Sequence, residues 1–195
     1  VGRITVDDVM DEVREQAERD YQLASGLSQD VESHDNVFRQ TTARLPWLLI
    51  GMLGGIGNSM ILGNFDTTFA AHPEMALYIP LIGGTGGNVG TQSSALVVQG
   101  LANSSLDSGN TFQQILKESV VALINATIIS MLVYIYNFIR FGATATVSYS
   151  VSISLFAVVM FASIFGTLVP MTLEKLKIDP AIATGPFISI TNDII

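Results

Sequence analysis

Long uncharged stretches along the chain alternate with short charged ones. Four of these stretches hold 21 or more residues: 45–65, 75–106, 119–139 and 141–173. A helix that crosses the ~30 Å hydrocarbon core of a bilayer needs about 20 predominantly apolar residues, so each stretch predicts one spanning helix. Asp179 and Pro180 then form a helix-start pair, an N-cap followed by a proline at the first helical position. They predict a fifth span that runs up to Ile195.

The predicted fold is all-α, a polytopic membrane protein with five transmembrane helices per subunit, preceded by short amphipathic cytoplasmic helices. The spans are placed at about 45–66, 75–101, 115–140, 148–173 and 180–195. They make up a transmembrane domain of residues 45–195, which follows an acidic helix at 1–26 and a connecting helix at 27–44. In the acidic helix, apolar residues recur at three- and four-residue steps from Val6 to Tyr21, as in an amphipathic helix in water.

The basic residues near the ends of the spans set the predicted orientation. One side carries Arg39, Arg44, Lys117, Lys175 and Lys177, and the other side carries Arg140 alone. Because short cytoplasmic loops carry an excess of Lys and Arg, the N-terminus is predicted to be cytoplasmic. The expected location is the inner or plasma membrane of the cell, which the chain crosses several times.

Composition agrees with a membrane protein and narrows its partners. The chain is 49% hydrophobic and 13% charged, whereas soluble domains carry about 25% charged residues. Its net charge is −8, and 10 of the 17 acidic residues lie in residues 1–35. Such a tail repels nucleic acid and anionic lipid, so its expected partners are cations or a basic protein surface. The lipid bilayer is the expected partner of the spanning helices. The chain has no cysteine, which excludes thiolate metal sites.

The second predicted span contains an unusual polar run, Gly83–Ser94, with five glycines and several amides and hydroxyls. No lysine follows the glycines, so the run is not a phosphate-binding loop. Such residues are tolerated inside a membrane where a cavity or neighbouring groups satisfy the backbone. The run therefore predicts a pore lining that includes Asn88, Thr91 and Gln92. A second interpretation is close helix packing through small residues four positions apart.

The sharpest candidate is Asp193, which lies 14 residues beyond Asp179 and hence ~21 Å along the fifth span. A carboxylate near the bilayer centre costs on the order of 3 kcal/mol, so such a residue is a functional candidate. Ser189 and Gly185 share its helix face, and the proline after Gly185 frees the carbonyl of Ile182. This combination favours a cation path. In the alternative interpretation the helix starts later and Asp193 lies among the lipid headgroups.

Three motifs together resemble the MgtE family of magnesium channels. They are Arg44–Leu49, the Gly83–Ser94 run ahead of Val97–Leu101, and Asp179–Ala181 continuing through Gly185 to Asp193. The resemblance covers residues 1–195 and implies a homodimer with one pore at its axis, lined by spans 2 and 5. It also implies that residues 1–26 end a CBS domain and that 27–44 form a plug-like connecting helix.

The resemblance further implies the residues that handle the ion. Asp193 and the backbone carbonyl of Ser189 would hold hydrated Mg²⁺, with Asn88, Thr91, Gln92, Gly185 and Ile182 lining the pore. Some family members carry asparagine where this chain has Gly185, so a side-chain contact there is not carried over. Regulation by cytoplasmic Mg²⁺ is expected to involve Asp8, Asp11, Glu12, Glu15 and Asp179. The alternative interpretation of the four acidic residues on the first helix is that they form an ordinary solvent-exposed helix face without a regulatory role.

The sequence therefore predicts a Mg²⁺-selective channel or transporter that is gated by cytoplasmic Mg²⁺. An enzyme is not expected, because the spans hold no histidine or cysteine. The alternative is a secondary transporter or exchanger of divalent cations, in which Asp193 binds a coupling H⁺ or Na⁺ and the broken second span alternates access.

Overall fold

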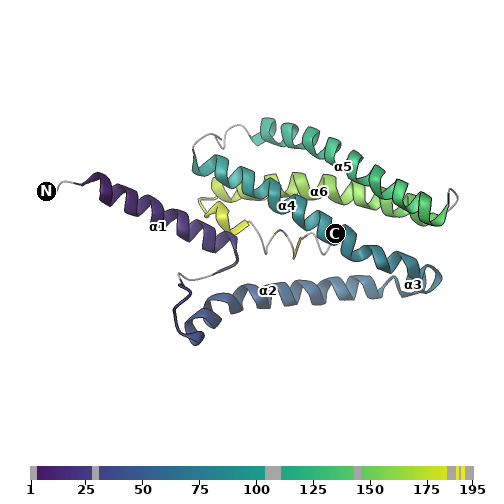
Figure 1. Ribbon diagram of the computed structural model, residues 1–195, viewed down its shortest axis with the longest axis horizontal. Coiled ribbons are helices and arrows are strands. Elements are labelled where there is room, and N and C mark those ends of the chain that lie inside the picture. The colour runs from purple at the N-terminus through teal and green to yellow at the C-terminus, as the bar shows by residue number, and fades with distance from the viewer. Residues whose placement is uncertain are drawn as a thin grey trace.

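A computed structural model describes residues 4–27, 31–103, 111–142, 146–183, 188, 190 and 191. These residues form helices joined by turns, and no strand occurs among them (Figure 1). The prediction of an all-α fold is confirmed. The elements are α1 (Val6–Ala24), α2 (Val37–Gly63), α3 (Asp66–Ala71), η1 (Pro73–Tyr78), α4 (Ile79–Ala102), α5 (Thr111–Phe141), α6 (Thr146–Lys175) and η3 (Pro180–Ala183).

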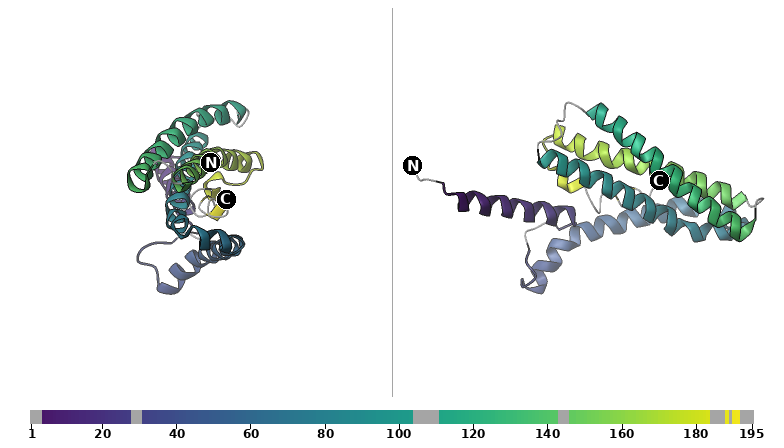
Figure 2. Two further views of the ribbon diagram at one scale, coloured as in Figure 1. Left: turned by 90° about the vertical axis from the view of Figure 1, so that its right-hand side faces the viewer. Right: turned by 45° about the horizontal axis from the view of Figure 1, so that its top comes forward.

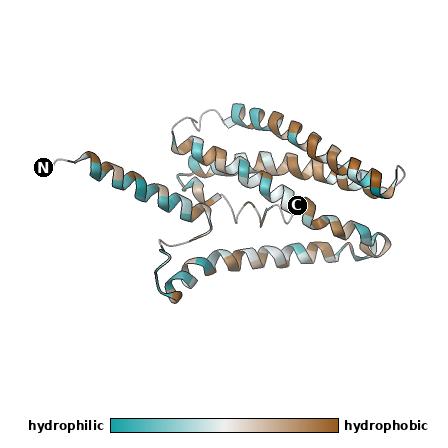
Figure 3. Ribbon diagram, viewed as in Figure 1, coloured by the Kyte–Doolittle hydropathy of each residue, from teal (hydrophilic) through white to brown (hydrophobic). Residues whose placement is uncertain are grey.

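Three of the described helices, α2, α5 and α6, are long and apolar enough to cross a membrane. Colouring by hydropathy shows the contrast between the largely apolar α5 and the mostly hydrophilic α1 (Figure 3). The 24 residues of α4 reach ~36 Å, which is also long enough. Its polar run lowers its hydropathy, so length and composition alone do not assign it as a span. Most of the predicted fifth span lies outside the described residues.

Helix α6 is the centre of the bundle, since α4 packs along one side of it and α5 along another (Figures 1 and 2). Within this chain, α6 buries the most residues of any described helix, among them Leu155 and Val159. Ala126 of α5 packs in the same cluster. At the other contact, a Cβ atom on Gly166 would overlap the backbone carbonyl of Gly90 in α4. The two helices approach this closely because both carry glycine at the crossing.

Helix α2 lies apart from this bundle. None of its most apolar window is buried within the chain. Of the described residues, Ile190 approaches it most clearly, because a Cβ atom on Gly54 would overlap the Ile190 side chain. Helix α2 therefore offers most of its apolar surface to lipid or to another chain.

The start of α2 differs from the predicted connecting helix. The sequence predicted a connecting helix over 27–44, but described residues 31–36 form turns and the helix begins at Val37. Asn36 caps it, since its Oδ1 accepts a hydrogen bond from the Arg39 amide at 2.8 Å. The helix then continues through Pro46 to Gly63 without a break, so the connecting segment and the first apolar stretch share one helix.

Candidate functional site

Helix α4 has two distinct faces. Its buried face consists of small residues that pack toward α6: Gly86, Gly90, Ser93, Ser94, Val97 and Gly100. The opposite face is exposed and carries Asn88, Gln92 and Gln99. We call these three the amide face, because steps of four and seven residues align their side chains along one side of a helix.

The amide face includes two of the predicted pore residues and one that sequence reasoning missed. Asn88 and Gln92 are exposed as expected, while Thr91 is half-buried at the boundary between the two faces. Gln99 was not predicted, although its position seven residues after Gln92 was a readable signal. In Figure 1 α4 crosses α6, and among the long helices of the described residues it packs extensively on α6 alone, so the face directed away from α6 is not covered by the bundle core.

A second polar cluster lies on the buried side of α4. The hydroxyl of Ser93 donates a hydrogen bond to Oε1 of Glu118 in α5 at 2.6 Å. The hydroxyl of Ser163 in α6 donates to the same oxygen, and the two hydroxyls lie 3.0 Å apart. All three side chains are buried. We call Ser93, Glu118 and Ser163 the Glu118 cluster.

Sequence reasoning missed the Glu118 cluster because Glu118 follows Lys117 and was interpreted as the charged end of an uncharged stretch. Placed on α5, the residue instead lies within the helix and points between its neighbours. A serine in each of two other apolar stretches was the available signal, but spacing along the chain does not show that these serines meet.

A pocket of about 420 Å³ lies where α1, the end of α4 and η3 meet. Three carboxylates line it, from Asp20, Glu174 and Asp179, together with the ammonium of Lys177. Oδ1 of Asp179 accepts a hydrogen bond from the Ala181 amide at 2.9 Å, which caps η3. The pocket is therefore an acidic, water-accessible junction between α1 and the membrane bundle.

The predicted regulatory residues of α1 do not reach this pocket. Thr5 donates to the Asp8 carboxylate from its hydroxyl at 2.6 Å and from its backbone amide at 2.8 Å. These bonds hold the pKa of Asp8 below its ordinary value. Glu12 and Glu15 lie 3.6 and 3.4 Å from Arg19, and Asp11 is exposed. Of the five predicted regulatory residues, only Asp179 lines the pocket.

The remaining predicted residues are only partly described. Asp193, Ser189 and Gly185 lie outside the described residues, and Ile182 is half-buried in η3. Within the part of the chain that the structure describes, no three histidine, cysteine or acidic side chains are arranged to hold a metal ion.

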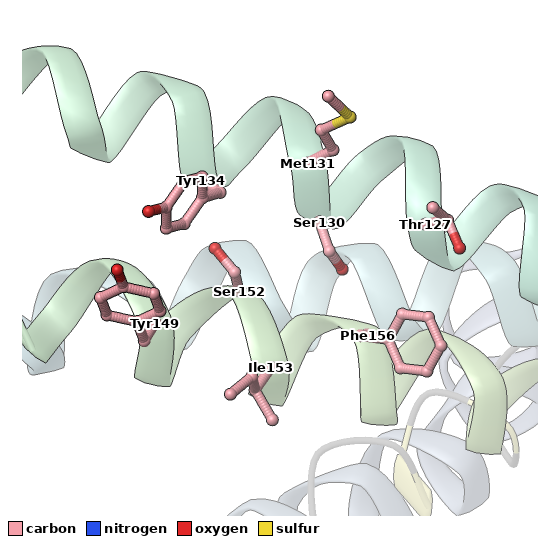
Figure 4. A pocket seen from close by; sticks show the side chains of 8 residues that line it. All are labelled: Thr127, Ser130, Met131, Tyr134, Tyr149, Ser152, Ile153 and Phe156. Carbon is pink, nitrogen blue, oxygen red and sulfur yellow. The ribbon is translucent and has the colours of Figure 1, made fainter. Parts of the chain in front are cut away.

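Another pocket, of about 340 Å³, lies between α5 and α6 (Figure 4). Its lining is apolar except for hydroxyl groups, and the rings of Tyr134 and Tyr149 approach to 5.4 Å at one end. The hydroxyls of Ser130 and Ser152 are buried and have no hydrogen-bond partner among the described residues. A lining without carboxylates or amides does not suit a divalent cation.

These features define a multi-pass α-helical membrane protein with a polar helix face inside an apolar bundle, the class to which channels and transporters belong. Comparison with known proteins identifies the family. A model described as "MgtE: Divalent cation transporter" matches residues 79–195. The chain belongs to the MgtE family.

Relatives named "Magnesium transporter MgtE" align with the whole chain. The protein from Bacillus subtilis is 32% identical over 195 residues and the one from Thermus thermophilus 32% over 200 residues. The relative from Enterococcus faecalis is 30% identical over 195 residues. The chain spans 43% of the length of the B. subtilis and T. thermophilus proteins and 42% of the E. faecalis protein.

Proposed function

We propose that this chain is the membrane part of a Mg²⁺-selective channel, which conducts hydrated Mg²⁺ through a pore at a dimer axis. The observation that carries the proposal is the amide face of α4, where Asn88, Gln92 and Gln99 are exposed on a helix inside an apolar bundle. Polar groups directed into hydrocarbon without partners are costly. These amides are stabilised if they line a water-filled path.

The chemistry of the amide face suits a hydrated divalent cation. Mg²⁺ demands near-octahedral oxygen geometry and dehydrates reluctantly, so proteins often bind it through its waters. Neutral amides can accept hydrogen bonds from these waters without binding the ion tightly enough to trap it. Gly84 is exposed on α4, and a Cβ atom there would meet no other described group within 4 Å, so this position adds width to the path.

In this proposal Asp193 supplies the charge. Its carboxylate and the backbone carbonyl of Ser189 hold the hydrated ion, with Gly185 and Ile182 lining the path nearby. Two Asp193 carboxylates that face each other across a twofold axis repel one another, and a divalent cation between them removes this repulsion. α4 and the segment after η3 then complete five spans with α2, α5 and α6.

A homodimer follows from the same arrangement. One chain contributes one Asp193 and one amide face, and a ring of ligands around a divalent ion needs at least two. Helix α2, with its apolar surface unburied within the chain, offers the area that a partner chain can cover. The chain is then a multi-pass protein of the cell membrane with a cytoplasmic N-terminus, as its basic residues predict.

The acidic pocket at the α1 junction is the proposed place where cytoplasmic Mg²⁺ acts on the pore. Asp20, Glu174 and Asp179 gather there, and α1 contacts η3. These carboxylates are not arranged to ligate an ion directly. A hydrated divalent cation in the pocket would relieve the repulsion between them through its waters and hold α1 against the bundle. Asp8, Asp11, Glu12 and Glu15 would contribute only through domains outside this chain.

The test is Mg²⁺ flux through the full-length dimer in liposomes. Asp193→Asn keeps nearly the same volume and removes the charge, so charge-assisted hydrogen bonds of roughly 1.5 to 3 kcal/mol become weaker neutral ones. If 1.5 to 3 kcal/mol of binding free energy is lost, flux at limiting Mg²⁺ should fall by roughly ten- to a hundredfold. Gel filtration and thermal melting control for folding.

Two results would count against the proposal. Wild-type flux and selectivity in a well-folded Asp193→Asn protein would remove the carboxylate from the ion path. Flux that saturates and follows an imposed H⁺ or Na⁺ gradient would instead identify a coupled transporter, in which Asp193 binds the coupling ion.

A further inference from the structure

The Glu118 cluster joins three helices at one point. Ser93 belongs to α4, Glu118 to α5 and Ser163 to α6, and both hydroxyls converge on Oε1 of the carboxylate. Helices α4 and α5 each pack extensively on α6, but not extensively on one another among the described residues. The bond from Ser93 to Glu118 therefore connects α4 directly to α5 within the body of α4. A second buried bond, from the hydroxyl of Tyr78 at the N-cap of α4 to Oδ1 of Asn137 in α5 at 2.5 Å, connects the two helices at the start of α4.

The cluster is closed by hydrogen bonds and leaves no space for an ion between its oxygens. Oxygens in the octahedral shell of Mg²⁺ lie ~2.0 to 2.1 Å from the ion, which separates neighbouring oxygens by about 2.9 Å. The Ser93 and Glu118 oxygens are closer than this, at 2.6 Å. The cluster also lies on the buried side of α4, away from the amide face. We therefore favour a role in which the cluster positions a helix of the bundle over one in which it binds the ion directly.

Where α4 and α6 come closest, the contact is between glycine backbones and involves no interlocking side chains. Gly90 and Gly166 meet backbone to backbone, and Gly86 and Gly100 lie on the same face of α4. Glycines permit a short distance between helices, but they lack the side-chain ridges that fit into grooves and resist rotation about the helix axis. These glycines do not fix the rotation of α4 by themselves. The side chains of Ile82 and Val89 pack against the buried cluster of Ala126, Leu155 and Val159, and the Glu118 cluster adds directional hydrogen bonds.

Rotation decides which residues of α4 face outward. Successive residues of an α-helix are ~100° apart, so Ser93 and its neighbour Gln92 point in different directions. We propose that Glu118 is a positioning residue for the pore. By accepting hydrogen bonds from Ser93 and Ser163, it fixes the rotation of α4 and so turns Asn88, Gln92 and Gln99 toward the ion path. This inference rests on the proposed function, because it takes the amide face as the pore lining.

The absence of cysteine makes a direct test possible. Single reporters, Asn88→Cys and Gln92→Cys, are placed in the full-length dimer, and their reaction rates with a membrane-impermeant, positively charged thiosulfonate are measured. Met131→Cys on the exposed face of α5 is the control reporter outside the path. Each reporter is combined with the original Glu118, with Glu118→Gln and with Glu118→Leu.

The expected rates distinguish the hydrogen-bond acceptor of the Glu118 side chain from its negative charge. With Glu118 present, both α4 reporters react and Met131→Cys does not. Glu118→Gln keeps a carbonyl oxygen that can accept both hydroxyls, so the α4 rates stay within about threefold. Glu118→Leu removes the acceptor and lowers the α4 rates about tenfold, the population change that loss of an ordinary buried hydrogen bond produces. Mg²⁺ flux falls with them.

A second pair of variants covers the case in which Glu118→Leu does not fold. Ser163→Ala removes one donor and lowers the α4 rates, while Ser163→Thr keeps a hydroxyl and restores them. A purely structural role would change the melting temperature in these variants and leave the reaction rates of Asn88→Cys and Gln92→Cys unchanged.

Three outcomes overturn the inference and are distinct from one another. Unreactive α4 reporters with the original Glu118 overturn the proposed pore lining and this inference with it. Reactive reporters whose rates ignore both Glu118→Leu and Ser163→Ala overturn the positioning role alone. If Glu118→Gln is as damaging as Glu118→Leu, the negative charge is what matters and the cluster is a cation subsite.

Discussion

Gln92 and Ser93 are neighbours in the chain with opposite environments. Gln92 is exposed on the amide face, whereas Ser93 is buried and donates a hydrogen bond to Glu118. Both are polar residues within one apolar stretch, and their types alone give no reason to separate them. The direction of each side chain on α4 assigns one to the proposed path and the other to helix packing.

Replacing Gln92 with leucine should lower Mg²⁺ flux without unfolding the protein. The substitution keeps a similar size but removes the donors and acceptors that meet the waters of the ion. Losing one or two hydrogen bonds of about 1 kcal/mol each predicts a decrease of roughly five- to thirtyfold at limiting Mg²⁺. Flux into liposomes that contain a Mg²⁺ indicator measures it.

The matched control for this prediction is Leu132→Met on the exposed face of α5. It changes side-chain shape at a position outside the amide face and should leave flux unchanged. Equal flux through the Gln92→Leu protein would mean that the amide face contacts a partner helix rather than the ion.

Asp8 and Thr5 make a reciprocal cap at the start of α1. The Asp8 amide donates to the Thr5 hydroxyl at 3.2 Å, and the Thr5 hydroxyl and amide donate to the carboxylate. Both latter bonds favour the ionised form, so the pKa of Asp8 lies below its ordinary value of 3.8. This contribution to helix stability is present above the unfolded-state pKa and is lost as the pH falls through the lower, folded-state pKa.

A carboxyl-carbon NMR titration of Asp8 should therefore give a pKa below 3.8. Thr5→Val removes the hydroxyl and should raise the pKa toward its ordinary value, while Thr5→Ser keeps a donor and should leave it low. A pKa that does not respond to Thr5→Val would contradict the hydroxyl as the main cause.

At the scale of helices, the crossing of α4 and α6 depends on glycine. A methyl group on Gly166 would overlap the backbone carbonyl of Gly90, and a backbone group cannot rotate away as a flexible side chain can. Gly166→Ala should therefore push the helices apart and destabilise the protein by about 1 to 3 kcal/mol, the usual cost of overpacking. Thermal unfolding of the purified protein in detergent measures this.

Gly55→Ala in α2 is the matched control. No other described group lies within 4 Å of a methyl group there, and alanine favours a helix over glycine by up to about 1 kcal/mol. It should melt at the same or a higher temperature. If both variants lose stability equally, the effect comes from glycine itself and not from the α4 and α6 contact.

At the scale of the whole molecule, the basic residues predict which ends of the helices share one side of the membrane. The chain near Asn103 and near Lys175 should lie with the N-terminus in the cytoplasm, and the chain near Ala70 and Thr144 outside. Single cysteines at these four positions should react with an impermeant maleimide from outside only at Ala70 and Thr144. Labelling at Asn103 in intact cells would reverse the orientation.

Much of the architecture was predictable because it depends on local and one-dimensional properties. The length of an uncharged stretch decides whether a helix can cross a bilayer, and the chain shows these lengths directly. The all-helical fold and the polar character of α4 were predicted in this way, while the family was indicated by a resemblance of three short motifs. The start of α2 was placed too early, because the cap at Asn36 is a weak local signal beside a long polar segment.

Tertiary structure alone decided what each polar residue of the bundle faces. Glu118 looks like the charged end of a stretch until α5 is packed against α6, where two serines 25 and 45 positions away reach it. Spacing alone aligns Gln99 with Asn88 and Gln92, but only the packing of the α4 glycines toward Gly166 shows that this face is the exposed one. Composition and spacing determine whether a helix enters the membrane, because the bilayer acts on each segment separately. Which face turns toward a neighbour is determined by contacts between segments distant in the chain, and no single segment contains that information.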